Sequence, residues 1–217
     1  MLISKINAGA QTVHSSSTSW PYSRATSKRK ISFEDLYKKL QENGFKNVSK
    51  KFNKVSSDVQ KVYVDWGTAV VAESSVALGT DGIATCAVLK LIDPTSDDIH
   101  YMLHAYSDTE PDLIAQSLKK ARSLGLSLKD SEIEIMPGGY LDSESTPHIL
   151  EALYKVNHSL IDKISLIRDF KVQDASFQGL VVYDGKTYRY PETYTDYSSS
   201  DYSTYLDKDG YEEVLLT

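Results

Sequence analysis

The residues with the clearest chemical potential surround Cys86, the only cysteine of the chain. The strand expected to begin at Cys86 returns, after an Asp93-Pro94 turn, as a second strand that carries His100 and His104. A cysteine attacks as its thiolate, and a neighbouring histidine can take the thiol proton. This arrangement predicts nucleophilic catalysis at the cysteine, with one of the two histidines as the base.

The register of the hairpin favours one histidine. With the turn centred between Thr95 and Ser96, Cys86 lies opposite residue 105 and beside His104. His100 lies four residues further along the strand, roughly 13 Å away at about 3.3 Å per residue. We therefore expect His104 to be the base and His100 to be a neighbour of the site or an exposed polar residue.

The stretch before the cysteine, Leu78 to Gly82, is expected to be a turn. Its glycines, Gly79 and Gly82, allow backbone angles that bring amide groups together as an oxyanion hole. Thr80 and Asp81 can both hydrogen-bond an imidazole and fix its tautomer. A plain glycine turn next to a buried structural cysteine would explain the same residues, so this alternative stays open.

Metal chemistry is not predicted. Histidines four residues apart share a ligand set on a helix but not on an extended strand, and no His-Glu-x-x-His pattern occurs. A single cysteine excludes an internal disulfide and zinc sites built from several thiolates. We expect no metal and no cofactor. His14, His148 and His158 lack a chemical context, and we expect surface or structural roles for them.

The elements around the hairpin predict an α+β fold, because strands occur in runs interrupted by helices. A helix is expected after Ser32, which caps it together with Asp35, and Gly44 ends it. A second helix is expected to begin at Thr109 and to end at Gly125. We expect a second short helix or a linker over 45–59, a strand or bulged strand over 62–72 and a strand over 133–136. A helical stretch is expected from Thr146-Pro147 to Phe170, with a possible break near Asn157-His158. A strand is expected from Val172, and a hairpin over 177–190 with a type I′ turn at Asp184-Gly185.

Composition and charge limit the function classes. The 217 residues fit one domain with extensions, and no apolar run is long enough to span a bilayer or to form a secretory signal. The net charge of −6 combines a basic segment, residues 1–58, with an acidic tyrosine-rich tail, residues 191–217. The basic residues show no nucleic-acid readout motif. Residues 10–30 are rich in Ser, Thr and basic residues, which predicts disorder. Such a segment fits either an ordinary flexible terminus or an export signal.

A longer pattern surrounds the candidate site: Thr80-x-x-x-x-x-Cys86-Ala-Val-x-x-x-x-Asp93-Pro94. It resembles the T-L-x-G-S-C-V-x-V-x-x-Y-D-P signature of CheD, the chemoreceptor glutamine deamidase, and the similarity covers roughly residues 59–190. Ala84-Thr85 stands where the family has Gly-Ser. The family's His-x-Met-Leu-Pro motif matches the sequence around His100 better than that around His104. The hairpin register favours His104 instead, and we follow the register because proton transfer requires contact.

The resemblance implies a CheD-like layered sheet with helices and a deamidase that uses Cys86, His104 and Thr80. It implies hydrolysis of a glutamine side-chain amide in a protein substrate. The flanking segments resemble those of CheD-like type III effectors of plant-pathogenic bacteria, the HopAF/XopAF group, which implies secretion and translocation into a host cell. The expected organisation is a disordered segment and possible secretion signal over 1–30, a helical extension over 31–58, the deamidase domain over 59–190 and the tail over 191–217.

Three alternatives remain. A chemotaxis deamidase would act on receptor glutamines but leaves the basic N-terminal segment unexplained. A transglutaminase would form the same thioester and resolve it with an amine instead of water. In a non-catalytic binding protein, the cysteine would contribute to packing and the acidic tyrosine-rich tail would be the binding surface. The sequence does not predict an oligomeric state.

Overall fold

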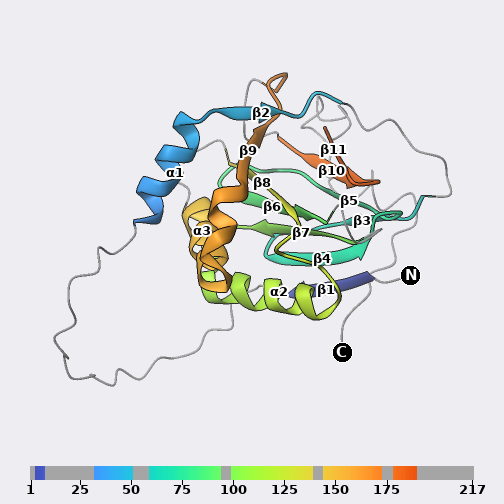
Figure 1. Ribbon diagram of the computed structural model, residues 1–217. Coiled ribbons are helices and arrows are strands. Elements are labelled where there is room, and N and C mark those ends of the chain that lie inside the picture. Colours follow the sequence, from blue (N-terminus) through green and yellow to red (C-terminus); the bar gives the residue numbers. More distant parts are fainter. Residues whose placement is uncertain are drawn as a thin grey trace.

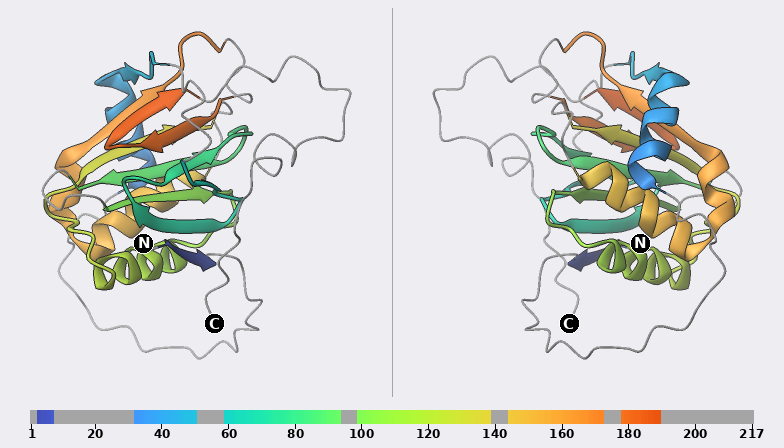
Figure 2. Two further views of the ribbon diagram at one scale, coloured as in Figure 1. Left: turned by 90° about the vertical axis from the view of Figure 1, so that its right-hand side faces the viewer. Right: turned by 90° about the vertical axis from the view of Figure 1, so that its left-hand side faces the viewer.

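The computed structural model describes residues 3–7, 32–50, 59–93, 99–138, 144–172 and 178–189 of the chain. In this part of the chain, helices cover one face of a large sheet and a smaller sheet covers the other face (Figures 1 and 2). The predicted α+β class is confirmed. None of the helices in the described residues is both long and apolar enough to cross a membrane.

The large sheet has seven strands with the order β1-β4-β7-β6-β8-β9-β2. The strands are β1 (Ile3–Asn7), β4 (Thr68–Glu73), β7 (Ile99–Ala105), β6 (Ala87–Ile92), β8 (Glu132–Pro137), β9 (Ile164–Arg168) and β2 (Phe45–Asn47). β6 and β7 form the antiparallel pair that the sequence predicts, and they occupy the middle of the sheet. The hairpin with the candidate residues is therefore buried on both faces.

The small sheet has four strands with the order β11-β10-β5-β3. The strands are β11 (Lys186–Arg189), β10 (Leu180–Tyr183), β5 (Ala77–Thr80) and β3 (Lys61–Tyr63). β10 and β11 meet at Asp184-Gly185, where both residues have positive φ, +48° and +63°. These angles fit a type I′ turn and confirm the predicted hairpin.

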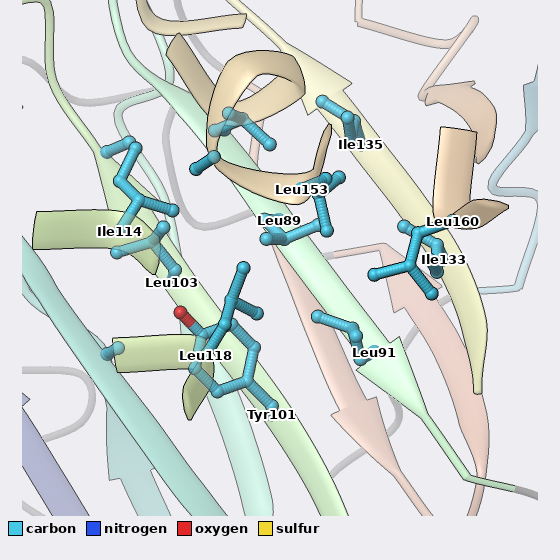
Figure 3. Packing of buried hydrophobic residues seen from close by; sticks show 14 of the residues in the cluster. Leu89, Leu91, Tyr101, Leu103, Ile114, Leu118, Ile133, Ile135, Leu153 and Leu160 are labelled. Atoms are coloured by element: carbon cyan, nitrogen blue, oxygen red, sulfur yellow. The ribbon is translucent and has the colours of Figure 1, made fainter. Parts of the chain in front are cut away.

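The helices pack on the face of the large sheet that points away from the small sheet (Figure 3). They are α1 (Phe33–Glu42), α2 (Pro111–Ser123), α3 (Ser145–Val156) and the 3₁₀ helix η1 (His158–Lys163). Leu89 and Leu103 of the central hairpin contact this layer together with Leu118 of α2 and Leu153 of α3. Because strand side chains alternate between faces, the even-numbered residues of the hairpin point to the small sheet instead.

The predicted start and end of the first helix are confirmed. Ser32 is the N-cap residue, and its Oγ accepts a hydrogen bond from the backbone N of Asp35 at 3.1 Å. Gly44 follows the helix with φ of +87°, a backbone conformation that side chains disfavour. The helix is amphipathic and places Leu36 and Leu40 against the core.

Several predictions from local pattern are wrong where long-range pairing decides the structure. Residues 45–47 form β2, which pairs in parallel with β9, in place of a helix or linker. The segment 62–72 is divided between β3 and β4, which belong to different sheets and are separated at Gly67. The predicted turn over 78–82 begins as strand β5, paired with β3 and β10. Disorder over 1–30 is wrong for Ile3–Asn7, which pairs with β4.

Two helix boundaries also differ from the prediction. Glu110, not Thr109, is the N-cap residue of α2, and Thr109 Oγ1 accepts a hydrogen bond from Tyr106 N at 3.1 Å. The helical stretch from residue 145 ends at Val156, so the break near Asn157 is real. The apolar stripe beyond it belongs to η1 and β9, and Val172 lies outside any strand. Pro147 is the third residue of α3, although proline favours the first helical position. The turn over 94–98 and the tail beyond 189 lie outside the described residues.

Candidate active site

The register of the central hairpin places the cysteine and one histidine on the same face. Ala87 pairs with Ala105 and Val88 pairs with His104, so the predicted register, with Cys86 opposite residue 105, is off by one residue. Cys86 precedes Val88 by two positions and therefore shares its face. This face points to the layer between the two sheets, where both residues are buried. Cys86 and His104 are thus diagonal neighbours, a relationship that the predicted register would not have allowed.

The small sheet supplies the partner of the histidine. Thr80, the last residue of β5, brings its Oγ1 to 2.6 Å from Nδ1 of His104, and both side chains are fully buried. The same Oγ1 donates a hydrogen bond to the carbonyl oxygen of Val64 at 2.8 Å. A hydroxyl has a single proton to donate, so Thr80 accepts from the histidine, and Nδ1 carries the ring proton. The lone pair of a neutral His104 is therefore at Nε2.

The resting charge state of the pair follows from burial. His104 Nε2 is buried and has no hydrogen-bond partner among the described residues, and burial lowers the pKa of His104 to about 4. Cys86 is 6 % exposed, and burial raises the pKa of its thiol, with a hydrogen bond to Thr85 acting in the opposite direction. At neutral pH the two groups are a thiol and a neutral imidazole. A neutral imidazole with a free Nε2 lone pair can accept the thiol proton when the thiol attacks.

His100 lies at the other end of the hairpin. It pairs with Ile92, six positions along β6 from Cys86, which corresponds to roughly 20 Å. It is buried rather than exposed, and burial lowers its pKa to about 4. Of the two histidines, His104 is the one beside Cys86. The register places His100 too far along the hairpin to contact the cysteine.

The loop between Thr80 and Cys86 differs in part from the expected oxyanion turn. Gly79 lies within β5 and is paired with Val181, so it does not contribute to a turn. Gly82 does have a positive φ of +68°. The backbone N of Ala84, two residues later, donates to the carbonyl oxygen of Gly82 at 2.8 Å. Asp81 accepts a hydrogen bond from Tyr63 OH at 3.0 Å, whereas Thr80 is hydrogen-bonded to the imidazole of His104.

Three residues near the site were not singled out from the sequence. Gly138 follows β8, and a Cβ atom there would lie 2.4 Å from the carbonyl oxygens of both Ala84 and Cys86, so only glycine lets the chain pass. Ser145 Oγ donates to the carbonyl oxygen of Thr85 at 2.9 Å. The Pro137-Gly138-Gly139 run was a usable sequence signal for the first residue. The second lies 60 positions from its partner, and sequence offers no signal for such a contact.

Trp66 is the third of these residues. Its ring makes an edge-type contact with the ring of His104, with the centroids 6.4 Å apart and the planes at 66°. The side chain is 59 % exposed. It lies in the connection between β3 and β4, a segment for which the sequence predicts a strand or bulged strand. The alternation of apolar and polar residues through Trp66 predicts a strand, whereas the structure has a turn there.

The remaining histidines of the described chain have structural contacts. His148 Nδ1 lies 3.1 Å from the carbonyl oxygen of Thr109, and His158 packs against the ring of Tyr154. Over the described ranges, no group of three or more His, Cys, Asp or Glu side chains is arranged to hold a metal ion. His14 lies outside these ranges.

Comparisons with known proteins give little beyond the structure itself. No protein-family model matches the chain, and no curated protein matches it. Among solved structures, the Bacillus licheniformis hypothetical protein YfiH is similar over 66 % of this chain and 70 % of its own, with 13 % sequence identity and a TM-score of 0.33. A likeness at this level carries no argument about function.

Proposed function

We propose that the protein is a cysteine-dependent deamidase that hydrolyses the side-chain amide of a glutamine in a protein substrate to glutamate. The observation that carries the proposal is the hydrogen bond between Thr80 and His104, on the sheet face shared with Cys86. It fixes the imidazole in the tautomer whose Nε2 is the proton acceptor, on the face that Cys86 shares. A buried cysteine that serves packing alone needs no such base.

The proposed reaction is an acyl transfer in two halves. The Cys86 sulfur attacks the carboxamide carbon and forms a C–S bond, and the thiol proton passes to Nε2 of His104. The tetrahedral intermediate collapses, the C–N bond breaks, and His104 returns the proton to the departing ammonia. Water then attacks the thioester and gives its proton to His104. Cleavage of the C–S bond releases glutamate and restores the thiol.

The resemblance of the Thr80–Cys86–Asp93-Pro94 pattern to the CheD signature also supports this reaction. It supports the finer proposal of a CheD-like layered fold as well. The effector branch is proposed from the Ser/Thr-rich basic segment, the added N-terminal helix and the acidic tail. In this proposal, residues 1–30 direct secretion and the protein acts in a host cell. The substrate gains a negative charge in place of a neutral amide, which alters its interfaces.

The decisive experiment is mass spectrometry of host-cell proteins incubated with the purified chain. Conversion of Gln to Glu adds about one dalton at a defined residue, and ammonia appears in equal amount. Cys86→Ala is the matched control, since it removes the nucleophilic sulfur and leaves a small apolar residue in the buried site. Sites that appear with the wild-type protein and not with Cys86→Ala support the proposal. No difference between the two proteins would overturn it.

A second candidate is a non-catalytic binding protein. The burial of Cys86, which raises the pKa of its thiol, favours this candidate because a structural cysteine is inert and buried. The two functions differ in one measurement. A binding protein retains its biological effect when Cys86 is replaced by alanine and the fold is intact, whereas a deamidase loses it.

A further inference from the structure

Trp66 is the most exposed large apolar side chain among the described residues, at 59 %, and it lies directly beside the proposed base. A Cβ atom at Gly82 would lie 3.9 Å from the indole Nε1. The indole therefore lies between β7, which carries His104, and the loop that leads to Cys86. An exposed apolar ring thus lies beside both elements, the strand of the proposed base and the loop before the proposed nucleophile.

The backbone around Trp66 is held firmly. Trp66 N donates to Asp65 Oδ1 at 2.7 Å, and Thr68 Oγ1 donates to the carbonyl oxygen of Asp65 at 2.6 Å. Gly67 N donates to the carbonyl oxygen of His104 at 2.8 Å, which ties the turn to the strand of the base. The exposure of the indole thus results from a turn that is fixed by hydrogen bonds.

Gly67 shows that the turn is also constrained by packing. Its φ is +67°, and a Cβ atom there would lie 2.7 Å from the ring of Tyr106. Only glycine fits both the backbone angle and the space. The conformation of the turn places a large apolar ring in water, although burying such a ring would stabilise the fold. A ligand that covers the ring would recover this free energy.

We propose that Trp66 is a specificity-determining residue that packs against the aliphatic stem of the substrate's carboxamide side chain. The inference rests on the proposed deamidase function. An indole face suits the methylene groups of the stem, and it accepts the flat amide group in the same contact. Glutamine has two methylene groups and asparagine has one, so the wall favours glutamine. The missing methylene corresponds to about fourfold in affinity.

Kinetics on short peptides test the proposal. Ammonia release is measured with acetyl-Ala-Gln-Ala-amide and with acetyl-Ala-Asn-Ala-amide. For Trp66→Ala we expect KM for the glutamine peptide to rise roughly tenfold, with kcat within about twofold of wild type. Trp66→Phe keeps an aromatic wall and is expected to stay within about threefold of wild type. The preference for glutamine over asparagine falls in Trp66→Ala and persists in Trp66→Phe.

Phe170 provides the matched control, since it is 56 % exposed and lies beyond β9. Phe170→Ala removes an exposed aromatic ring of similar accessibility and leaves kcat/KM unchanged. Equal kcat/KM in Trp66→Ala and wild type would overturn the role of Trp66 and leave the deamidase proposal standing. Absence of ammonia release by the wild-type protein on peptides and on host-cell proteins alike would overturn both.

Fluorescence gives an independent readout. The chain has two tryptophans, Trp20 and Trp66, so Trp20→Phe leaves Trp66 as the sole indole. In a Trp20→Phe/Cys86→Ala protein, which binds without turnover, the glutamine peptide is expected to shift the emission to shorter wavelength as it covers the ring. Unchanged emission at peptide concentrations above KM would contradict direct contact.

Discussion

Thr80 and His104 come from different sheets, and their side chains meet at 2.6 Å in the buried layer between them. β5 pairs with β3, and this pairing brings the carbonyl oxygen of Val64 to the other side of the Thr80 hydroxyl. The imidazole tautomer is therefore a product of the packing of the two sheets. Any change that shifts β5 relative to the central hairpin also changes the proposed base.

Thr80→Val tests this relationship. Valine fills the same volume but leaves the His104 Nδ1 proton and the Val64 carbonyl oxygen without the hydroxyl, which costs about 1–3 kcal/mol in a buried site. Because the tautomer is no longer fixed, we expect deamidation to fall roughly 10- to 100-fold. Thr80→Ser restores the hydroxyl and most of the activity. Deamidation rates and urea unfolding of both variants provide the measurement.

A hydroxyl on the other face of the sheet serves as the control for Thr80→Val. Ser117 Oγ lies 2.7 Å from Tyr101 OH in the helix-covered core. Ser117→Ala removes a buried hydroxyl and is expected to destabilise the fold without reducing the rate per folded molecule. Equal activity losses in Ser117→Ala and Thr80→Val would contradict a specific role of Thr80.

The choice of histidine is tested by paired substitutions. His104→Asn removes the proton acceptor beside Cys86, and we expect a loss of roughly 100- to 10,000-fold in rate. His100→Asn changes a buried residue of β7 whose pairing partner, Ile92, lies six positions from Cys86 along β6, and it is expected to reduce stability while the folded protein stays active. Rates normalised to the folded fraction provide the comparison. A large loss in His100→Asn alone would reverse the assignment.

The elements were predictable where the pattern is local, and less so where pairing partners are distant. The cap at Ser32, the central hairpin and the Asp184-Gly185 turn follow from neighbouring residues. The strand over 45–47 does not, because its stability comes from pairing with β9 more than a hundred residues later. The predicted hairpin register differs from the structure by one residue, because the position of the turn was not known to within one residue. A shift of one residue changes which side chains share a face.

The candidate site was predictable in its residues more than in its geometry. The spacing of Thr80 and Cys86 pointed to both residues, but the contact between Thr80 and His104 depends on the packing of the two sheets. The sequence suggested a turn at Thr80, whereas a strand positions it. Trp66 offered no signal, since a tryptophan in an alternating apolar pattern is typical of a buried strand.

The resting charge state predicts how the thiol reacts with alkylating agents. Burial raises the pKa of Cys86, and burial also keeps His104 neutral, so no imidazolium is present to stabilise the thiolate. We expect the iodoacetamide labelling rate of Cys86, followed by intact mass, to rise with pH and to have its midpoint above that of an ordinary thiol. A midpoint near or below pH 7 would instead indicate a preformed thiolate–imidazolium pair.

The buried histidines predict lower stability in acid. Burial lowers the pKa of His100 and of His104 to about 4 from an ordinary value near 6.5. Between about pH 6.5 and pH 4 the unfolded chain binds protons that the folded chain does not, so the free energy of unfolding falls as pH decreases. Each histidine contributes up to about 1.4 kcal/mol per pH unit in this window. Above pH 6.5 this contribution is constant.

His100→Leu isolates one of these contributions. Urea unfolding of wild type and variant at several pH values between 7 and 4 should show a shallower pH dependence for the variant. His158→Gln is the control, since it replaces a histidine that lies on the surface. Parallel curves for wild type and His100→Leu would contradict the expected linkage.

A buried ion pair within the large sheet also bonds to a strand of the small sheet. Lys90 of β6 bonds to Glu134 of β8 at 2.5 Å, with side-chain exposures of 2 % and 15 %, and also to Thr187 of β11. Lys90→Met leaves the carboxylate in a poorly hydrated site without its cation, and we expect a loss of about 3–5 kcal/mol in the free energy of unfolding. The double variant Lys90→Met/Glu134→Gln removes both charges and should recover much of the loss.

An exposed pair gives the scale for this effect. Lys155 bonds to Asp112 at 2.9 Å with side-chain exposures of 41 % and 77 %, and Lys155→Met is expected to cost less than about 1 kcal/mol. Urea unfolding of the wild type and the three variants at pH 7 measures both pairs. A loss in Lys90→Met no larger than that in Lys155→Met would mean that water reaches Glu134. In that case the contact between the sheets depends on apolar packing around Lys90 rather than on its charge.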